Sequence, residues 1–195
     1  MKNFAGLNLG MALCGSFCTF SKAIDVMENL VQLGVSITPI MSYNAYETST
    51  RFGKASEIIA KIESITGKTV IHTMDAAEPL GPKHMVDAML IAPCTGNTLA
   101  KLNYGITDTP VLLGAKSLMR NGKPIIICLA TNDGIGANLK NIGGLINKKN
   151  VYFVPLGQDD FIHKPYSLVA DFAQIQSTLE GALSGTQIQP IFINY

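Results

Sequence analysis

The sequence has little charge, few cysteines and no long hydrophobic run, and each shortage excludes a class of protein. Only 15% of the 195 residues are charged, and the net charge of +1 comes without any block of like charges. The chain therefore lacks the basic surface with which proteins follow a phosphate backbone, which argues against nucleic acid as a partner. No apolar stretch approaches the roughly 18 residues that a membrane-spanning helix needs, so we expect no membrane partner either.

The four cysteines do not form a pattern typical of a metal site or a disulfide framework. Cys14, Cys18, Cys94 and Cys128 lie in or beside apolar segments, and their spacing differs from that of paired CxxC motifs. We therefore predict no metal site. Because 47% of the residues are hydrophobic, the chain can build a core without cross-links, and reduced thiols in the cytoplasm are expected. The apolar start, residues 1–17, fits a buried strand and turn better than a signal peptide.

What the sequence does contain is a regular alternation of apolar strands and amphipathic helices. Strands with continuous apolar character indicate a parallel sheet that is buried on both faces. We predict one α/β domain over residues 1–195, with three layers and a mainly parallel six-stranded sheet of the flavodoxin or Rossmann type. The low charge and the apolar tail at 185–195 also predict a homo-oligomer. The predicted strands are 7–14, 35–42, 70–74, 87–94, 123–131 and 151–157, and the predicted helices are 21–34, 56–67, 98–105, 109–122, 138–150 and 166–184.

Small polar residues follow four of the predicted strands. In parallel sheets, ligands bind where the strands end and the next helices begin, and a helix N-terminus favours an anion. The first of these loops lacks the GxGxxG pattern of standard dinucleotide-binding folds, and each loop taken alone is also compatible with a capped turn that holds no ligand. Together they predict a cofactor-binding edge formed by Gly15, Ser16, Ser42, Asn44, Pro93, Thr95, Gly96, Asn97 and Asn132.

These strand ends resemble a known family. The segment APCTGNTLAKLNYGITDTPVLL, residues 92–113, resembles the PASANT segment and following pattern of the flavin-containing cysteine decarboxylases. CGSFC resembles the first flavin-phosphate turn of that family, and MSYNA resembles its second strand end. The family includes phosphopantothenoylcysteine and lantibiotic peptide decarboxylases, and flavin prenyltransferases are related. The resemblance covers most of residues 7–155 and implies FMN near the boundary between protomers in trimers or multiples of trimers.

Within this superfamily, further motifs resemble the family of dipicolinate synthase B subunits from endospore-forming bacteria. The motifs STRFGKASE, AEPLGPK, IAPCTGN, TDTPVLLGAK, ATNDGIG and FVPLGQDD occur in the same order over residues 42–165. The resemblance implies an oxidoreductase of the mother-cell cytoplasm that makes pyridine-2,6-dicarboxylate, or dipicolinate, from the dihydrodipicolinate synthase product during sporulation. It also implies a partner, the A subunit of dipicolinate synthase, which is similar to nicotinamide-dependent dehydrogenases, and NADP bound with or by that partner.

The departures from the decarboxylase pattern concern its catalytic residues. The decarboxylases carry a catalytic histidine several residues before the aspartate that opens the PASANT strand, whereas Glu78 stands near that place here and His84 is only three residues from Asp87. Their PxMN motif is replaced by LATND, which retains the asparagine as Asn132 but has Thr131 at the methionine position. Both differences argue against cysteine decarboxylation. A decarboxylase of the parent family and a non-catalytic assembly protein remain alternatives.

The implied reaction suggests what the site must contain. A dicarboxylate substrate needs cationic or amide clamps, and Arg51, Asn97 and Asn132 are predicted to supply them because arginine binds carboxylates in bidentate fashion. Lys83 and Lys116 are weaker candidates.

Loss of water and two electrons from the substrate ring also requires a general base. Glu78 and His84 are the predicted catalytic residues, and Asp133 and Asp159 are alternatives. Cys94 would have a lowered pKa at a helix N-terminus, although small-residue packing also explains a cysteine there.

Overall fold

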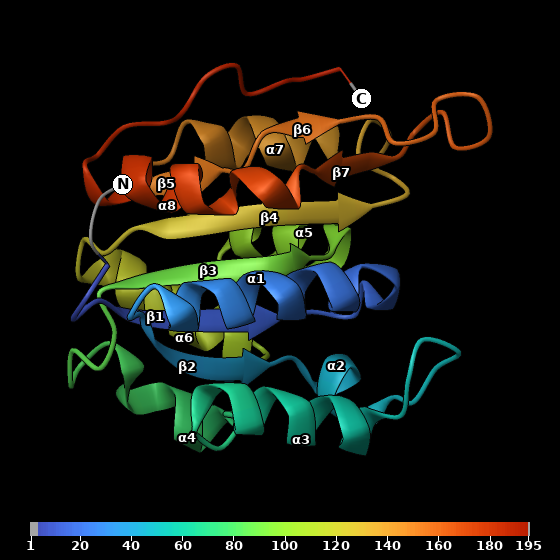
Figure 1. Cartoon of the computed structure of the whole chain (residues 1–195). Helices are drawn as coiled ribbons and strands as arrows, with labels where there is room; N and C mark the ends of the chain where they lie inside the picture. Colours follow the sequence, from blue (N-terminus) through green and yellow to red (C-terminus); the bar gives the residue numbers. More distant parts are fainter. Residues whose placement is uncertain (1–3, 195) are drawn as a thin grey trace.

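The sheet is built from strands whose continuous apolar character buries them between helices. The computed structural model describes residues 4–194, and Figure 1 shows the sheet with its strands side by side. The strand order is β2-β1-β3-β4-β7-β6, and β5 pairs with the first half of the β4 edge. The strands are β1 (Asn8–Leu13), β2 (Ser36–Met41), β3 (Ala88–Cys94), β4 (Ile125–Thr131), β5 (Val151–Phe153), β6 (Leu156–Gly157) and β7 (Leu168–Ala170).

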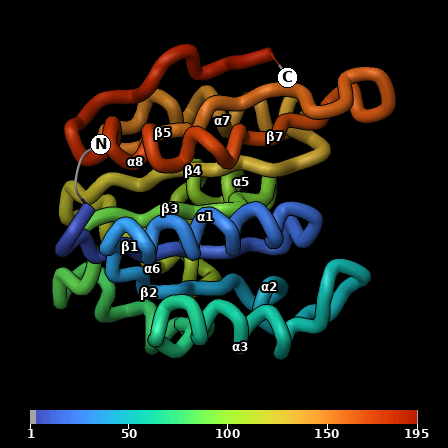
Figure 2. Tube along the Cα trace, viewed as in Figure 1, coloured from blue at the N-terminus to red at the C-terminus, as the bar shows by residue number. Residues whose placement is uncertain are grey.

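Helices cover both faces of this sheet and complete three layers. Figures 1 and 2 show α1, α3 and α8 in front of the sheet and α5, α6 and α7 behind it. The helices are α1 (Phe20–Gln32), α2 (Tyr43–Glu47), α3 (Ala55–Thr66), α4 (Met74–Ala77), α5 (Gly96–Tyr104), α6 (Pro110–Arg120), α7 (Leu139–Ile146) and α8 (Ile175–Leu183), with short 3-10 turns η1 (Phe17–Thr19), η2 (Glu78–Leu80) and η3 (Phe172–Gln174). No helix within residues 4–194 has the length and apolar character to cross a membrane.

The predicted α/β fold is confirmed, with four differences. The sheet has seven strands and not six, and β6 and β7 run antiparallel to each other, as do β7 and β4. The predicted strand 70–74 is reduced to one bridge between Ile40 and Ile71. The predicted strand 151–157 is split into β5 and β6 around Pro155, which has no N–H for the ladder. β7 occupies the start of the predicted helix 166–184.

The central strands form the densest part of the core. Every residue of β3 is buried, and so are six of the seven residues of β4. The apolar tail pairs with β6, the outermost strand on its side of the sheet. The backbone of Leu156 in β6 exchanges hydrogen bonds with Ile191 and Ile193 at 2.8 and 2.9 Å. The tail therefore packs on its own chain, and it leaves Phe192 54% exposed.

The topology brings the ends of β1, β2, β3 and β4 to one edge of the sheet. These four strands are parallel, and their arrowheads point the same way in Figure 1. The loops that leave them, together with the loop 158–166 between β6 and β7, lie at this strand-end edge. The loops that enter the parallel strands lie at the opposite edge.

Candidate functional site

Two adjoining cavities open at the strand-end edge. Cavity A has a volume of about 420 Å³ and lies at the ends of β1, β3 and β4, and cavity B has a volume of about 320 Å³ and lies at the ends of β1, β2 and β3. Gly15 and Thr95 line both cavities. The two hollows are therefore neighbouring parts of one site, with the β1 and β3 loops between them.

The start of α5 forms the wall that the two cavities share. Thr95 caps this helix, because its Oγ1 accepts a hydrogen bond from the backbone N–H of Thr98 at 3.2 Å. The first intrahelical bond runs from the Leu99 N–H to the Thr95 carbonyl at 2.9 Å. The N–H groups of Gly96 and Asn97 precede that bond, so they point out of the helix end. Together with the helix dipole they favour an anion at this position.

Two positions at the site, Gly96 and Gly15, carry glycine for different physical reasons. A Cβ at Gly96 would lie 2.5 Å from Asn138 Nδ2 and 2.9 Å from Thr131 Oγ1, so the protein itself leaves no room for a side chain. A Cβ at Gly15 would make only ordinary contacts, 3.5 Å to the ring of Phe17. Packing within the protein would therefore allow a side chain at position 15. The absence of one keeps both cavities open.

This difference predicts opposite outcomes for two alanine variants. Gly96→Ala should lower the free energy of unfolding by about 1–2 kcal/mol because the added methyl overpacks the loop. Gly15→Ala should leave thermal unfolding near that of the wild type and should weaken binding of FMN, the cofactor that the sequence resemblance implies, because the added methyl would occupy ligand space. Calorimetry and flavin fluorescence titration measure the two effects. Equal stability losses in both variants would contradict this assignment.

Three charged side chains line cavity A. They are Lys22 of α1, Asp159 and Lys164. The Asp159 carboxylate accepts a hydrogen bond from Ser167 Oγ at 2.7 Å and lies 3.8 Å from Lys164 Nζ. Sequence reasoning named Asp159 but missed both lysines, because only the fold brings α1 and the loop 158–166 to the same cavity.

Most of the predicted cofactor-binding residues come together at this site. Pro93 does not line either cavity, but its carbonyl accepts a hydrogen bond from the Cys14 N–H at 3.0 Å and joins the ends of β3 and β1. Ser42 caps α2 by accepting a bond from the Ala45 N–H at 3.4 Å. The predicted residues that line the cavities are Gly15, Ser16, Ser42, Asn44, Thr95, Gly96, Asn97 and Asn132.

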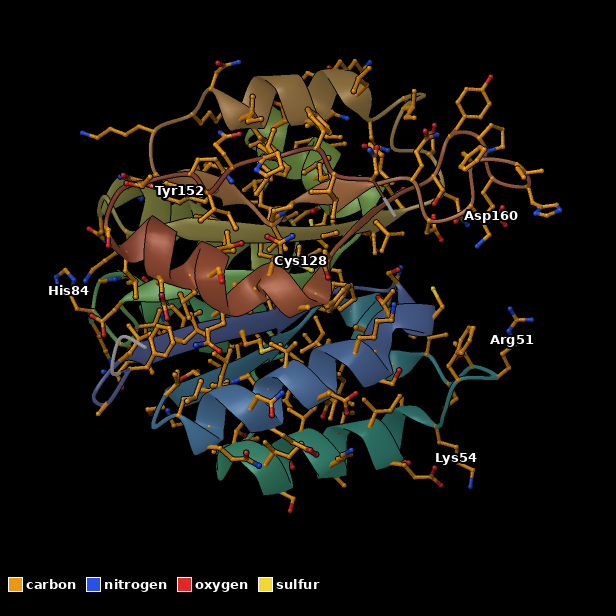
Figure 3. The ribbon with its side chains drawn as sticks, turned by 45° about the horizontal axis from the view of Figure 1, so that its top comes forward. Arg51, Lys54, His84, Cys128, Tyr152 and Asp160 are labelled. Atoms are coloured by element: carbon orange, nitrogen blue, oxygen red, sulfur yellow. The ribbon has the colours of Figure 1, made fainter. Side chains whose placement is uncertain are left out.

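The structure does not bring the predicted catalytic residues Glu78 and His84 to these cavities. Glu78 lies in η2 and His84 in the exposed loop that enters β3, so both lie at the opposite edge of the sheet. Figure 3 shows His84 and Asp160 at opposite ends of the molecule. Within one chain, neither residue can serve as a base at the strand-end edge, and Lys83 is excluded by the same geometry. Counting residues through this irregular loop gave no information on which edge of the sheet the two side chains occupy.

The predicted clamp Arg51 lies at the correct end of the sheet but outside the cavities. Its side chain projects from the exposed loop after α2, where the guanidinium carbon lies 4.9 Å from the centre of the Phe52 ring. Lys116 of α6 also lines neither cavity. Asp133 shapes its own loop, because its Oδ1 accepts a bond from the Ala137 N–H at 2.9 Å.

Three of the four thiols are core side chains. Burial raises the pKa of the Cys14 thiol to about 11, and it raises the pKa values of Cys94 and Cys128 well above their usual range. Cys94 is therefore a neutral packing residue and not an activated thiolate. The exposed thiol is Cys18, which lines cavity A.

The chain is similar to proteins of known name over its whole length. The Flavoprotein family model matches residues 2–177. The B subunit of dipicolinate synthase from Bacillus subtilis (strain 168) is 42% identical over 196 aligned residues, which cover 100% of this chain and 98% of that protein.

Solved structures show the same relationship. The crystal structure of the dipicolinate synthase B subunit from Bacillus halodurans C matches with a TM-score of 0.90 and 46% identity, over 98% of both chains. The FMN-dependent cysteine decarboxylase SpaF shares the fold, with a TM-score of 0.69 and 22% identity over 92% of this chain and 98% of SpaF. This chain therefore belongs to the flavoprotein family and, within it, to the dipicolinate synthase B subunits.

Proposed function

We propose that this chain acts as the B subunit of a dipicolinate synthase. It works with an A subunit to form pyridine-2,6-dicarboxylate from the dihydrodipicolinate synthase product, in the mother-cell cytoplasm of a sporulating bacterium. The observation that carries this proposal is the full-length similarity to two proteins of that name, at 42% and 46% identity. The preserved backbone, with a TM-score of 0.90 to the second protein, supports the same use of the strand-end edge.

FMN is the cofactor that the site fits best. The backbone N–H groups of Gly96 and Asn97 and the hydroxyls of Ser16 and Ser42 would hold its phosphate, because anions bind at such helix starts. Gly15 leaves room where the two cavities adjoin, so that one ligand can extend across both of them. When bound, FMN supplies a carrier for the two electrons that leave the substrate ring. NADP belongs with the partner protein in this proposal.

Cavity A supplies groups that suit a dicarboxylate. Lys22 and Lys164 provide two cations, and Asn132 adds an amide. Asp159 is the candidate base, because Ser167 holds its carboxylate in place at the cavity wall. Among the described residues no histidine lines either cavity, which disfavours the decarboxylase alternative.

We also propose that the chain forms a homo-oligomer, as a trimer or a multiple of trimers. The strand-end edge carries exposed apolar side chains on the loop 158–166, where Phe161 is 67% exposed and Ile162 72% exposed. Side chains of this kind favour burial against another protein surface.

Replacement of Lys164, a cation that lines cavity A, should have a specific kinetic effect. Lys164→Met should raise the KM for the dicarboxylate substrate about threefold to tenfold, because one exposed charge-assisted contact is lost. Arg51→Met is the matched control and should leave the KM unchanged, since Arg51 lines neither cavity of its own chain. Initial rates measured in the presence of the A subunit test both variants. An increased KM for Arg51→Met alone would restore the original assignment.

Reconstitution of the synthase tests the proposed function directly. The A subunit, this chain and dihydrodipicolinate synthase are combined, and pyridine-2,6-dicarboxylate is measured by its ultraviolet absorbance, with NADP and FMN supplied separately. Product should form only when both subunits are present. Undiminished product formation without this chain would reject the catalytic role. A requirement for the chain that persists in variants unable to bind FMN would favour the assembly role.

A further inference from the structure

A chain of three amide side chains connects α5 and α7 to the loop that leaves β4. Asn103 Nδ2 donates to Asn141 Oδ1 at 3.2 Å, and Asn141 Nδ2 donates to Asn138 Oδ1 at 3.1 Å. Asn138 Nδ2 then donates to the backbone carbonyl of Asp133 at 3.0 Å. The three amides point the same way, and each donor finds the next acceptor.

The middle of this hydrogen-bonded series of amides is removed from water. Asn138 is 8% exposed and Asn141 is 3% exposed. Buried amides are costly when they lack partners, so each asparagine is held in the orientation that satisfies its neighbour. At the far end, Lys148 Nζ donates to the Asn103 backbone carbonyl at 2.8 Å and ties the end of α7 to α5.

The Asn138 end of this series of amides lies against cavity A. The Asn138 amide and the Thr131 hydroxyl flank Gly96 so closely that no Cβ fits there. The Asp133 carbonyl that receives the last hydrogen bond belongs to the loop 131–138, and the Asp133 N–H donates to Thr131 Oγ1 at 3.3 Å. Gly96 and Thr131 both line cavity A.

The Asn103 end of this series of amides explains a feature of α7 that is unusual for a helix. Two adjacent glycines, Gly143 and Gly144, lie inside α7 and reduce its helix propensity. A Cβ at Gly144 would collide with the side-chain amide of Asn103, whereas a Cβ at Gly143 would meet nothing within 4 Å. Gly144 is therefore required by the amide chain, and Gly143 is not.

We propose that Asn103, Asn141 and Asn138 form a positioning network for cavity A. The network fixes the loop 131–138 against the start of α5, and so it sets the distance between the Gly96 N–H and the polar groups of Thr131 and Asn132. These asparagines are positioning residues and not catalytic ones. The proposal deepens the proposed function, because the ligand that it positions is FMN or the substrate beside it.

The two glycines of α7 provide a matched test, because neither lines a cavity. Two quantities are measured in the full chain: the FMN dissociation constant, and hydrogen exchange of the backbone amides in 131–138 without ligand. Gly144→Ala should weaken FMN binding about threefold to tenfold, the range for one lost neutral hydrogen bond, and should speed exchange in that loop. Gly143→Ala should leave both quantities at the wild-type values and raise the melting temperature, since alanine favours a helix.

Repeating the test in a variant that already lacks the Asn103 amide separates positioning from simple loss of stability. Asn103→Ala removes the amide with which the Gly144→Ala methyl collides, so adding Gly144→Ala to it should cause no further change in affinity or exchange. An equal effect of Gly144→Ala in both backgrounds would overturn the network, and so would identical behaviour of Gly143→Ala and Gly144→Ala. If the wild type fails to bind FMN, the cofactor proposal is rejected, and the exchange measurement alone then decides the network.

Discussion

The free energy of unfolding should fall by about 3–4 kcal/mol between neutral pH and pH 10, because three buried thiols ionise less readily in the folded chain than in the unfolded chain. In the unfolded chain the thiols ionise around their usual pKa of 9.0, whereas burial raises the pKa of folded Cys14 to about 11 and the pKa values of Cys94 and Cys128 further. Above pH 9 the unfolded state therefore holds fewer protons, and stability decreases as pH rises. By pH 10 each buried thiol contributes roughly 1 kcal/mol to this loss.

Single variants separate the thiols from other alkaline effects. Cys128→Ala should reduce the loss of stability at pH 10 by roughly 1 kcal/mol, the contribution of one thiol. Its stability at pH 7 should be lower than that of the wild type, because the substitution leaves a cavity. Cys18→Ala is the matched control, since it removes a thiol that is exposed in the folded chain and not one from the core. Urea unfolding at several pH values provides the measurements. A wild-type stability that stays constant up to pH 10 would show that the buried thiols ionise without unfolding.

Much of the fold could be predicted because burial on both faces leaves a strong pattern. β3 and β4 are continuous apolar runs, and their predicted bounds agree with the structure within about two residues. The errors fall where local pattern is weak. The run 151–157 reads as one strand, and only the position of Pro155 and the tertiary pairing of Leu168–Ala170 show why it is split.

The part of the candidate site that could be predicted is the part formed by the ends of parallel strands, where ligands bind in such sheets. The rule that ligands bind at strand ends brought Gly15, Thr95 and Asn97 together correctly, because the ends of parallel strands must meet at one edge. It could not predict Lys164, which enters cavity A through a loop between two antiparallel strands. Nor could it predict the amide of Asn138, whose role depends on the packing of two helices that no local pattern relates.

The residues of the site differ in how strongly the packing of the protein constrains them. Gly96 and Asn138 are constrained by the protein, so changes there alter stability and ligand binding together. Asn97 is exposed on the cavity B wall, and so its replacement should leave the core intact. It is therefore the residue at which a ligand effect can be measured with the least interference from folding.

Asn97→Asp should make the ligand-free chain slightly more stable and the FMN complex much weaker. Asn97 is the second residue of α5, where a negative charge gains about 0.3–1 kcal/mol from the helix dipole. The same charge faces the phosphate that we place at this helix start. Two charges about 5–10 Å apart repel by about 1.5–3 kcal/mol at an effective dielectric constant near 20, which raises the FMN dissociation constant about tenfold to a hundredfold.

The neutral variant Asn97→Ala separates charge repulsion from loss of the amide. It should weaken FMN binding only by the value of one neutral hydrogen bond, about 0.5–1.5 kcal/mol. Added salt should narrow the gap between the two variants, because screening acts on repulsion and not on a lost neutral contact. Calorimetric melting of the ligand-free chains and flavin fluorescence titrations supply both quantities. If Asn97→Asp binds FMN as tightly as the wild type, the phosphate does not lie at the start of α5, and the loop that leaves β3 serves only to end the strand and cap the helix.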